Sequence, residues 1–157
     1  VEGRFNQIKL RNNSVAVIDY SHTPDSLLKA ITTIREILEE NKSKNRIITV
    51  FGCGGNRDKT KRPVMGEIAA KFSDEVIITS DNPRDEDPIA IIEEIKAGIK
   101  SDNYSIEEDR EIAIQKAVEM SNKGDVILIA GKGHETYQEI KGIKYNLSDK
   151  ETALKYS

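Results

Sequence analysis

Residues 75–88, EVIITSDNPRDEDP, read as one strand–loop–helix unit. The apolar run EVIIT (residues 75–79) is typical of a buried strand, because it is short, rich in β-branched residues and nearly continuous. The polar loop that follows contains Pro83, which fixes a turn, and Arg84, which is the only cation among four carboxylates. Asp87 and Pro88 then supply the cap and the first-turn proline of a helix.

The same alternation extends along the chain in both directions. Apolar runs predict three more central strands, at residues 14–20 (SVAVIDY), 46–51 (RIITVF) and 125–130 (DVILIA). Amphipathic helices are predicted between the strands, with these inward residues: Leu27, Leu28, Ile31, Ile34, Ile37 and Leu38 in a helix begun by Thr23 and Pro24; Val64, Met65, Ile68, Ala69 and Phe72 in a helix opened by Pro63; and Ile89, Ile92, Ile95 and Ile99 in the helix after Asp87. A further helix, capped by Asp109, is predicted to run to about Ser121.

The C-terminal part has a different pattern. Residues 137–146 (YQEIKGIKYN) predict a hairpin that turns at Lys141 and Gly142, and SDKE (Ser148 to Glu151) is a capping box before a last short helix. Buried strands separated by amphipathic helices indicate a mostly parallel sheet with helices on both faces. The predicted fold class is therefore α/β and Rossmann-like, in one domain over residues 1–157, with a short C-terminal hairpin.

Composition excludes several classes of protein. The chain has 157 residues, 37% hydrophobic and 32% charged, which suits one globular domain with a core of its own. A net charge of −3 provides no basic field for nucleic acid. No apolar run is long enough to span a membrane, and no signal peptide is recognisable. A single cysteine, Cys53, excludes an internal disulfide, so we expect a cytoplasmic protein.

Each predicted central strand is followed by a loop of unusual composition. The loops are DYSHTPD (residues 19–25), GCGGNRDKTKR (52–62), SDNPRDEDP (80–88) and GKGHETY (131–137). In a parallel sheet all four lie at the carboxyl edge, where such folds bind ligands. The coincidence of four such loops at one edge indicates a binding site more strongly than any one of them.

Each loop also has a plain structural interpretation. The glycines of residues 52–55 suit a tight turn, and they form neither a P-loop nor a complete G-x-G-x-x-G motif. His22 and His134 lack an evident third ligand, so no metal site is predicted. Lys132 and Glu135 could be a solvated pair, and Arg84 could simply neutralise its acidic neighbours, with Asp85, Glu86 and Asp87 as an exposed cluster at a helix start.

The stretches DYSHTPDSL, FGCGGNRDKTKRPVMG, SDNPRDEDP and AGKGHETYQ together resemble the C-terminal domain of the Mur ligases, in the same order and with matching spacing. Residues 1–10, which begin VEGRFN, resemble the hinge segment and first strand of that domain. The resemblance implies a third domain that closes over ATP, with an N-terminal domain and a central ATPase domain absent from this chain. The central domain would bind most of the Mg²⁺. The resemblance places no catalytic residue in this chain, so the isolated chain is predicted to be inactive.

Within the family, the sequence DNPR resembles the members that add meso-2,6-diaminopimelate to UDP-N-acetylmuramoyl-L-alanyl-D-glutamate in peptidoglycan synthesis. The resemblance then implies the site residues. Those for diaminopimelate are Arg57, Asp81, Asn82, Pro83, Arg84, Gly131 and Glu135, and those on the nucleotide side are Arg4, Asp19, Tyr20 and His22. Arg84 would bind the distal carboxylate and Glu135 the distal ammonium. Lys59 and Lys61 could favour phosphate or be flexible surface lysines.

Two other functions stay open at this point. One is a Mur-type ligase domain that adds lysine or another amino acid, although DNPR argues against lysine. The other is a stand-alone module that binds a nucleotide or an amino acid. The sequence does not separate diaminopimelate from lanthionine, which keeps both distal charges.

Overall fold

The computed structural model describes residues 5–157, so the predicted nucleotide-side residue Arg4 lies outside the described part of the chain. Its helices and strands alternate as the sequence predicts. In chain order they are β1 (Asn6–Lys9), β2 (Val15–Asp19), α1 (Pro24–Glu40), β3 (Ile47–Phe51), α2 (Lys61–Phe72), β4 (Glu75–Ile78), α3 (Pro88–Lys96), β5 (Tyr104–Ile106), α4 (Arg110–Met120), β6 (Val126–Ala130), β7 (Tyr137–Ile140), β8 (Ile143–Asn146) and α5 (Asp149–Tyr156).

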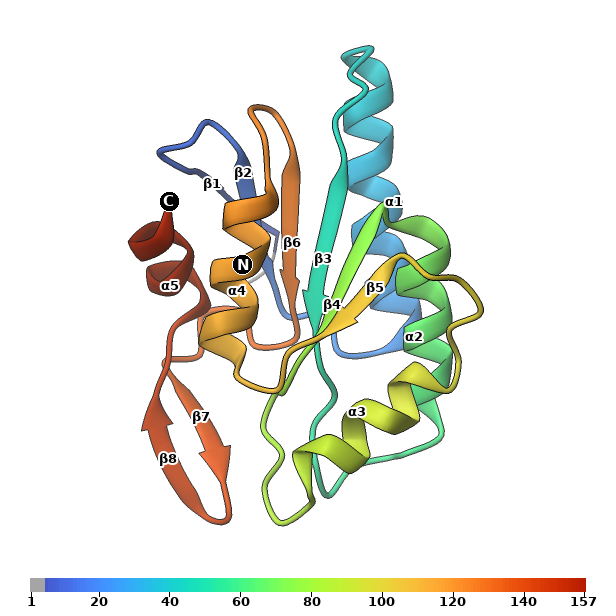
Figure 1. The fold of residues 1–157 in the computed structure, drawn as a ribbon, viewed down its shortest axis with the longest axis vertical. Helices are drawn as coiled ribbons and strands as arrows, with labels where there is room; N and C mark the ends of the chain where they lie inside the picture. Colours follow the sequence, from blue (N-terminus) through green and yellow to red (C-terminus); the bar gives the residue numbers. More distant parts are fainter. Residues whose placement is uncertain (1–4) are drawn as a thin grey trace.

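One six-stranded sheet, in the order β1-β2-β6-β3-β4-β5, runs through the middle of the molecule (Figure 1). Strand β1 is antiparallel to β2, and all the other neighbours are parallel. Helices α1, α2 and α3 pack on one face, and α4 and α5 pack on the other. The predicted α/β class is confirmed, and so is the hairpin, which forms a separate two-stranded sheet of β7 and β8.

Alternate side chains of the central strands feed two separate cores. Ile47 and Phe51 of β3 face α1–α3, whereas Ile48 and Val50 of the same strand face α4 and α5. All five residues of β3 are buried, as are all five of β6. This burial on both faces explains why the strands appear in the sequence as unbroken apolar runs rather than as alternating ones.

The predicted helix starts are mostly confirmed by capping contacts. Thr23 and Ser26 form a reciprocal capping box at the start of α1. The side chains of Asp87, Asp109 and Ser148 accept hydrogen bonds from backbone N–H groups in the first turns of α3, α4 and α5. Helix α2 is the exception, since it begins at Lys61 instead of Pro63.

Three residues predicted to face inward are exposed instead. Ile37 is 39% exposed, Val64 44% and Ile89 42%. In α3 the inward stripe is formed by Ile91, Ile92 and Ile95, because the helix is apolar on several sides and periodicity alone does not fix its rotation. Ile99 lies beyond the end of this helix, and the edge strand β5 was not predicted at all.

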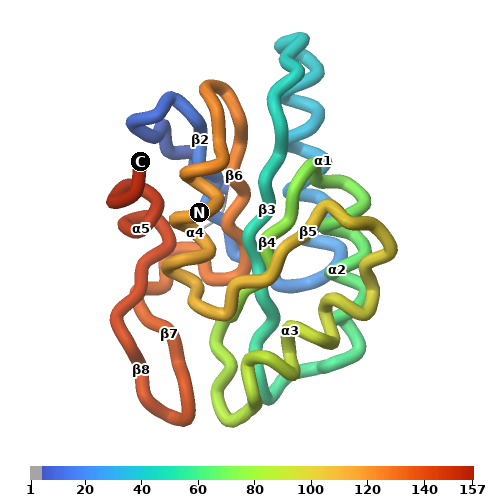
Figure 2. Tube along the Cα trace, in the orientation of Figure 1, coloured from blue at the N-terminus to red at the C-terminus, as the bar shows by residue number. Residues whose placement is uncertain are grey.

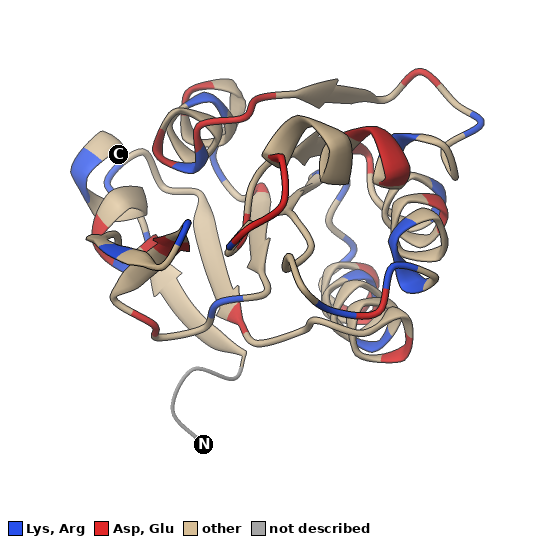
Figure 3. Cartoon of the chain, turned by 90° about the horizontal axis from the view of Figure 1, so that it is seen from below, with Lys and Arg blue, Asp and Glu red and all other residues tan. Residues whose placement is uncertain are grey.

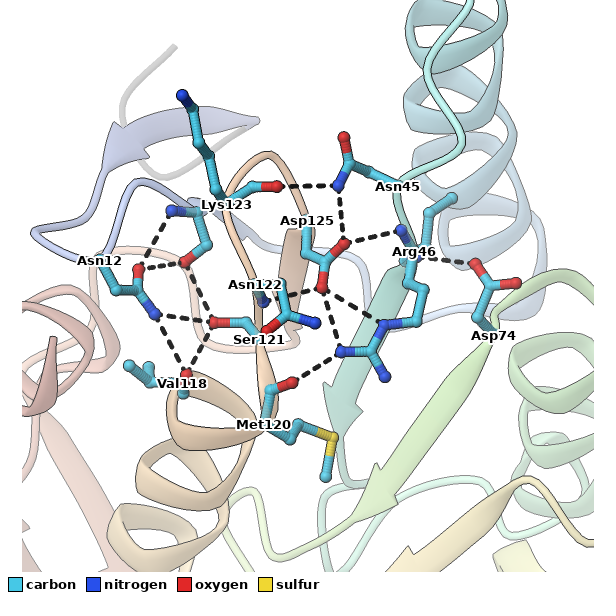
Figure 4. A network of polar contacts seen from close by, with 12 residues as sticks. Asn12, Asn45, Arg46, Asp74, Val118, Met120, Ser121, Asn122, Lys123 and Asp125 are labelled. Atoms are coloured by element: carbon cyan, nitrogen blue, oxygen red, sulfur yellow. Dashed lines mark hydrogen bonds and ion pairs between the residues drawn. The ribbon is translucent and has the colours of Figure 1, made fainter.

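The amino ends of the strands are held by a polar network around Asp125 (Figure 4). Its carboxylate accepts hydrogen bonds from the backbone N–H of Arg46 at 2.9 Å and of Asn122 at 2.8 Å, and from the Asn45 amide at 3.0 Å. Burial would raise the pKa of Asp125, but these N–H donors outweigh it and lower the pKa. The network thus joins β3 to β6 at the edge opposite the predicted site.

Candidate functional site

The four unusual loops do meet at the carboxyl edge of the sheet (Figures 1 and 2). The Gly131 N–H donates to the Asp19 carbonyl at 3.0 Å, which joins the loops after β6 and β2. The Gly55 N–H donates to the Asn82 carbonyl at 2.8 Å, which joins the loops after β3 and β4. The sequence-based expectation that the loops converge is therefore confirmed.

Close backbone packing explains the glycines of the loop after β3. A Cβ atom on Gly55 would lie 1.8 Å from the Pro83 carbonyl oxygen, so no side chain fits there. A Cβ atom on Gly54 would lie 2.9 Å from Arg84 Nη1 and 3.7 Å from Arg57 Cγ. Gly54 therefore leaves room for the two arginines that the sequence assigned to the amino-acid side.

A buried polar cluster lies where the loop after β4 meets the loop after β6. Lys132 is fully buried, and its ammonium donates to Asn82 Oδ1 at 2.9 Å and to Glu135 Oε1 at 3.1 Å. It also lies 3.9 Å from the Asp81 carboxylate. The interpretation of Lys132 and Glu135 as a solvated pair is therefore wrong, because the neighbouring loop supplies Lys132 with acceptors and covers it.

Asp81 lies at the bottom of this cluster and is 7% exposed. Burial raises the pKa of the Asp81 carboxyl, although Arg110 and Lys132 act in the opposite direction. A Cβ atom on Gly131 would lie 2.6 Å from Asp81 Oδ2, so glycine at position 131 leaves space for this carboxylate. Glu135 is more accessible than Asp81, with a side chain that is 27% exposed.

The side chain of Arg84 lies between the loop after β3 and the hairpin. Its Nη1 donates to the Gly55 carbonyl at 3.0 Å, and its Nε lies 3.4 Å from Glu139 Oε1. Its backbone has a φ of 52°, which is uncommon for a residue other than glycine. Arg84 pairs with Glu139 of β7 rather than with the acidic residues next to it in sequence. The interpretation of Arg84 as a counter-ion for its acidic neighbours in the sequence is therefore wrong, because its ion pair is with Glu139.

The acidic stretch after Arg84 is not simply a surface cluster. Glu86 accepts from the buried guanidinium of Arg62 at 2.6 Å and from the Asn56 N–H at 2.8 Å. Hydrogen bonding from Arg62, the largest cause, lowers the pKa of Glu86 to about 2. Glu86 therefore fixes the loop after β3, while Asp87 caps α3 as predicted.

The predicted nucleotide-side residues line a hollow of about 510 Å³ beside β2, where Asp19, Tyr20 and His22 lie together with Phe5 and Lys29. The Asp19 carboxylate accepts hydrogen bonds from the Phe5 N–H at 2.7 Å and the Ser21 N–H at 3.1 Å. Asp19 therefore fixes both its own loop and the segment that leads into β1.

The ring of Tyr20 connects this hollow to the amino-acid side. It packs edge-on against His134, with the ring centroids 5.3 Å apart. Burial, and then the charge of Glu135, raise the pKa of Tyr20. The two predicted halves of the site are therefore in contact.

The remaining cations at this edge lie closer to solvent. Arg57 is exposed and donates to the Asn56 carbonyl at 3.0 Å. Lys59 pairs with Glu86 at 3.2 Å, and Lys61 donates to the His22 carbonyl at 2.7 Å. Seen from this end of the molecule, basic and acidic segments are interspersed, so the carboxyl edge carries charges of both signs (Figure 3).

Metal binding and thiol chemistry have no evident place among residues 5–157. No group of three or more histidine, cysteine, aspartate or glutamate side chains in this range is arranged to hold a metal ion. Burial raises the pKa of the Cys53 thiol to about 12, so it is protonated at neutral pH. Within the same residues, no helix is long and apolar enough to cross a membrane.

Comparison with known proteins gives this arrangement a family. The family model described as "Mur ligase, glutamate ligase domain" matches residues 3–133. The chain belongs to this family.

Relatives of this Mur ligase domain include two UDP-N-acetylmuramoyl-L-alanyl-D-glutamate–2,6-diaminopimelate ligases. The ligase of Bacteroides thetaiotaomicron is 52% identical over 155 residues, and that of Fusobacterium nucleatum is 51% identical over 152. Each match covers 96% of this chain but only 31% and 30% of the respective relative. The chain thus spans about a third of the length of these relatives.

Two solved structures resemble this chain to different degrees. A structure of a ligase with the same name superposes with a TM-score of 0.88 at 38% identity, over 99% of this chain and 31% of that one. The bifunctional folylpolyglutamate synthase/dihydrofolate synthase of Yersinia pestis, solved with AMPPNP and a manganese ion, gives 0.62 at 16% identity, over 83% of this chain and 28% of that one. The second likeness shows only a shared fold.

Sequence reasoning missed one central ion pair of this Mur ligase domain. Arg110 and Asp149 are fully buried, with two hydrogen bonds of 2.8 Å between them. Arg110 also donates to the Ser80 carbonyl at 2.8 Å and the Ala130 carbonyl at 3.1 Å. Burial alone would lower the pKa of Arg110, but Asp149 outweighs it and raises the pKa. The pair fixes the carboxyl ends of β4 and β6, where two of the site loops begin.

Proposed function

We propose that this chain is the third domain of an ATP-dependent amide ligase. The ligase adds meso-2,6-diaminopimelate to UDP-N-acetylmuramoyl-L-alanyl-D-glutamate in peptidoglycan synthesis. The observation that carries the proposal is the presence of Arg84 at the edge of the site, in a chain that is about 50% identical to ligases of that name. Arg84 has the fork geometry that a carboxylate accepts in two parallel hydrogen bonds.

The arrangement suits a diamino acid whose distal end is a zwitterion. Arg84 provides a cation for the distal carboxylate, and Glu135 provides a partly exposed anion for the distal ammonium. Asn82 lies between them, where Lys132 and the Glu139 N–H both donate to its side-chain oxygen. These contacts fix the orientation of the Asn82 amide, so its NH₂ faces Glu135 at 3.5 Å. Lysine carries the distal ammonium but no carboxylate, so it would satisfy only half of this site.

The hollow beside β2 is the candidate place for the nucleotide. Tyr20 and His22 offer flat rings at its wall, which suits an adenine, and its position beside the amino-acid side suits a domain that closes over ATP. The residues described here do not form a metal site, so any magnesium ion would be held mainly by other domains. When bound, ATP would activate the acceptor carboxylate, while this domain would orient the incoming amine and exclude water.

The proposal includes an N-terminal domain and a central ATPase domain as partners, in the cytoplasm where ATP is available. The isolated 157-residue chain should fold but show no magnesium-dependent ATP hydrolysis. A stand-alone nucleotide- or amino-acid-binding module is the second candidate, and an upstream G-K-[ST] loop in the same reading frame would count against it.

The test of the proposal is Arg84→Ala in the full-length protein. The charge-assisted contact is worth about 1.5–3 kcal/mol, so kcat/KM for meso-diaminopimelate should fall roughly tenfold to a hundredfold. L-Lysine use should fall far less. Arg84→Lys should rescue poorly, because an ammonium lacks the two-pronged geometry. An equal loss with both amino acids would mean that Arg84 supports the loop instead of reading the substrate.

A further inference from the structure

The contacts of Arg84 restrict how a substrate carboxylate can reach it. Nη1 already donates to two backbone carbonyls, those of Gly55 at 3.0 Å and Asn82 at 3.4 Å. A two-pronged contact with a carboxylate needs two neighbouring nitrogens of the guanidinium. The edge that remains is the one formed by Nε and Nη2.

Glu139 lies on that same edge, with its Oε1 3.4 Å from Arg84 Nε. Both side chains are mostly covered, at 20% and 29% exposed, so the pair is less screened by water than a surface ion pair. A distal carboxylate that binds in two prongs would therefore meet a carboxylate already in place. Two carboxylates at one edge of one guanidinium repel each other.

The backbone of Glu139 is fixed independently of its side chain. Its N–H donates to Asn82 Oδ1 at 2.9 Å, and its carbonyl accepts the Arg84 N–H at 3.1 Å. The Lys141 N–H donates to the Arg84 carbonyl at 2.8 Å, which completes a parallel bridge between Arg84 and β7. The carboxylate of Glu139 can therefore turn away from Arg84 while the hairpin stays attached to the loop.

We propose that Glu139 is an internal counter-ion that occupies the carboxylate-binding edge of Arg84 and is displaced by the distal carboxylate of the substrate. The inference rests on the proposed function. Glu139 keeps Arg84 paired in the empty site and also when lysine is bound. Displacing it lowers the affinity for diaminopimelate, so Glu139 reduces the discrimination that Arg84 alone would give.

The experiment is Glu139→Gln in the full-length ligase, with kcat and KM measured for meso-diaminopimelate and for L-lysine. Glutamine has the same shape and keeps both backbone hydrogen bonds, but it carries no charge. We expect KM for diaminopimelate to fall about two- to fivefold with kcat little changed, which is the effect measured for ion pairs that water still reaches. The ratio of specificity constants should shift toward diaminopimelate by the same factor. Glu93→Gln is the matched control, because Glu93 lies on α3 and pairs only loosely with Lys96, at 3.9 Å.

A double variant separates this role from a structural one. In an Arg84→Ala background, Glu139→Gln should change the ratio by a smaller factor, because the competition for Arg84 no longer exists and only the direct repulsion between the two carboxylates remains. An unchanged or lowered ratio in the single variant overturns the inference, and so does an equal effect with and without Arg84. If Arg84→Ala itself leaves the ratio unchanged, the proposed function fails first. If Arg84→Ala lowers diaminopimelate use but Glu139→Gln does not raise the ratio, only the role of Glu139 is refuted.

Discussion

Replacing Arg110 by methionine tests how the carboxyl edge of the sheet is held together. The substitution removes the only described ionic partner of Asp149, which is fully buried at the first turn of α5. Breaking one partner of a buried pair typically costs about 3–5 kcal/mol, because the other charge stays uncompensated. The Ser80 and Ala130 carbonyls each lose a donor as well. The favourable interaction of the Asp149 carboxylate with the N-terminus of α5 would offset only about 0.3–1 kcal/mol of this loss.

We therefore expect Arg110→Met to lower the free energy of unfolding by about 3–5 kcal/mol. For a domain of this size, each kcal/mol lowers Tm by roughly 2–4 °C, so the melting point should fall by roughly 6–20 °C. The assay is urea unfolding followed by far-ultraviolet circular dichroism, since the chain has no tryptophan for fluorescence. Lys155→Met is the control. Lys155 pairs with Glu111 at 3.1 Å, but its side chain is 63% exposed, so its loss should cost far less stability than the loss of Arg110.

The double variant Arg110→Met/Asp149→Leu decides whether the stranded charge is the cause. Removing both charges should make the protein more stable than Arg110→Met alone, because no buried carboxylate remains unpaired. The reasoning is refuted if Arg110→Met costs no more than Lys155→Met. It is also refuted if the two substitutions of the pair are simply additive.

Two further predictions concern the site loops. Glu86 has a pKa of about 2 in the folded chain, against an ordinary value of 4.5, so its stabilising contribution is complete above pH 4.5 and is lost as the pH falls toward 2. Glu86→Gln should flatten this part of the stability–pH curve, which can be measured by urea unfolding at each pH. If the free energy of unfolding of Glu86→Gln depends on pH in this range as steeply as that of the unchanged protein, the low pKa assigned to Glu86 is contradicted. His22→Ala in the full-length protein should raise KM for ATP more than KM for the amino acid. The reverse pattern in steady-state kinetics would show that the nucleotide side and the amino-acid side of the site were assigned the wrong way round.

Local signals were enough to predict most of the fold. The strands are buried on both faces, so their apolar runs are conspicuous, and the caps Thr23, Asp87, Asp109 and Ser148 act within a turn of the helix that they begin. The convergence of the four loops followed from parallel pairing alone. Strand β5 was missed because three residues, two of them exposed, give no periodic signal.

The partners of the site residues were beyond sequence reasoning. Lys132 is buried by Asn82, which lies 50 positions earlier in the chain. Arg110 and Asp149 are 39 positions apart, and no local pattern marks either as a buried ion. The glycines on both sides of Lys132 were a signal of close packing around that loop. They could have suggested that the lysine was enclosed rather than solvated.

The hairpin lies against the loop of Arg84 and beyond the part of the chain that the family model matches. The model matches residues 3–133, whereas Glu139 and Asp149 belong to the hairpin and helix that follow. This C-terminal segment therefore places one carboxylate beside Arg84 and a second one that anchors the central sheet. Substitutions in the hairpin could thus change the charge next to Arg84 while both cores of the sheet stayed as they are.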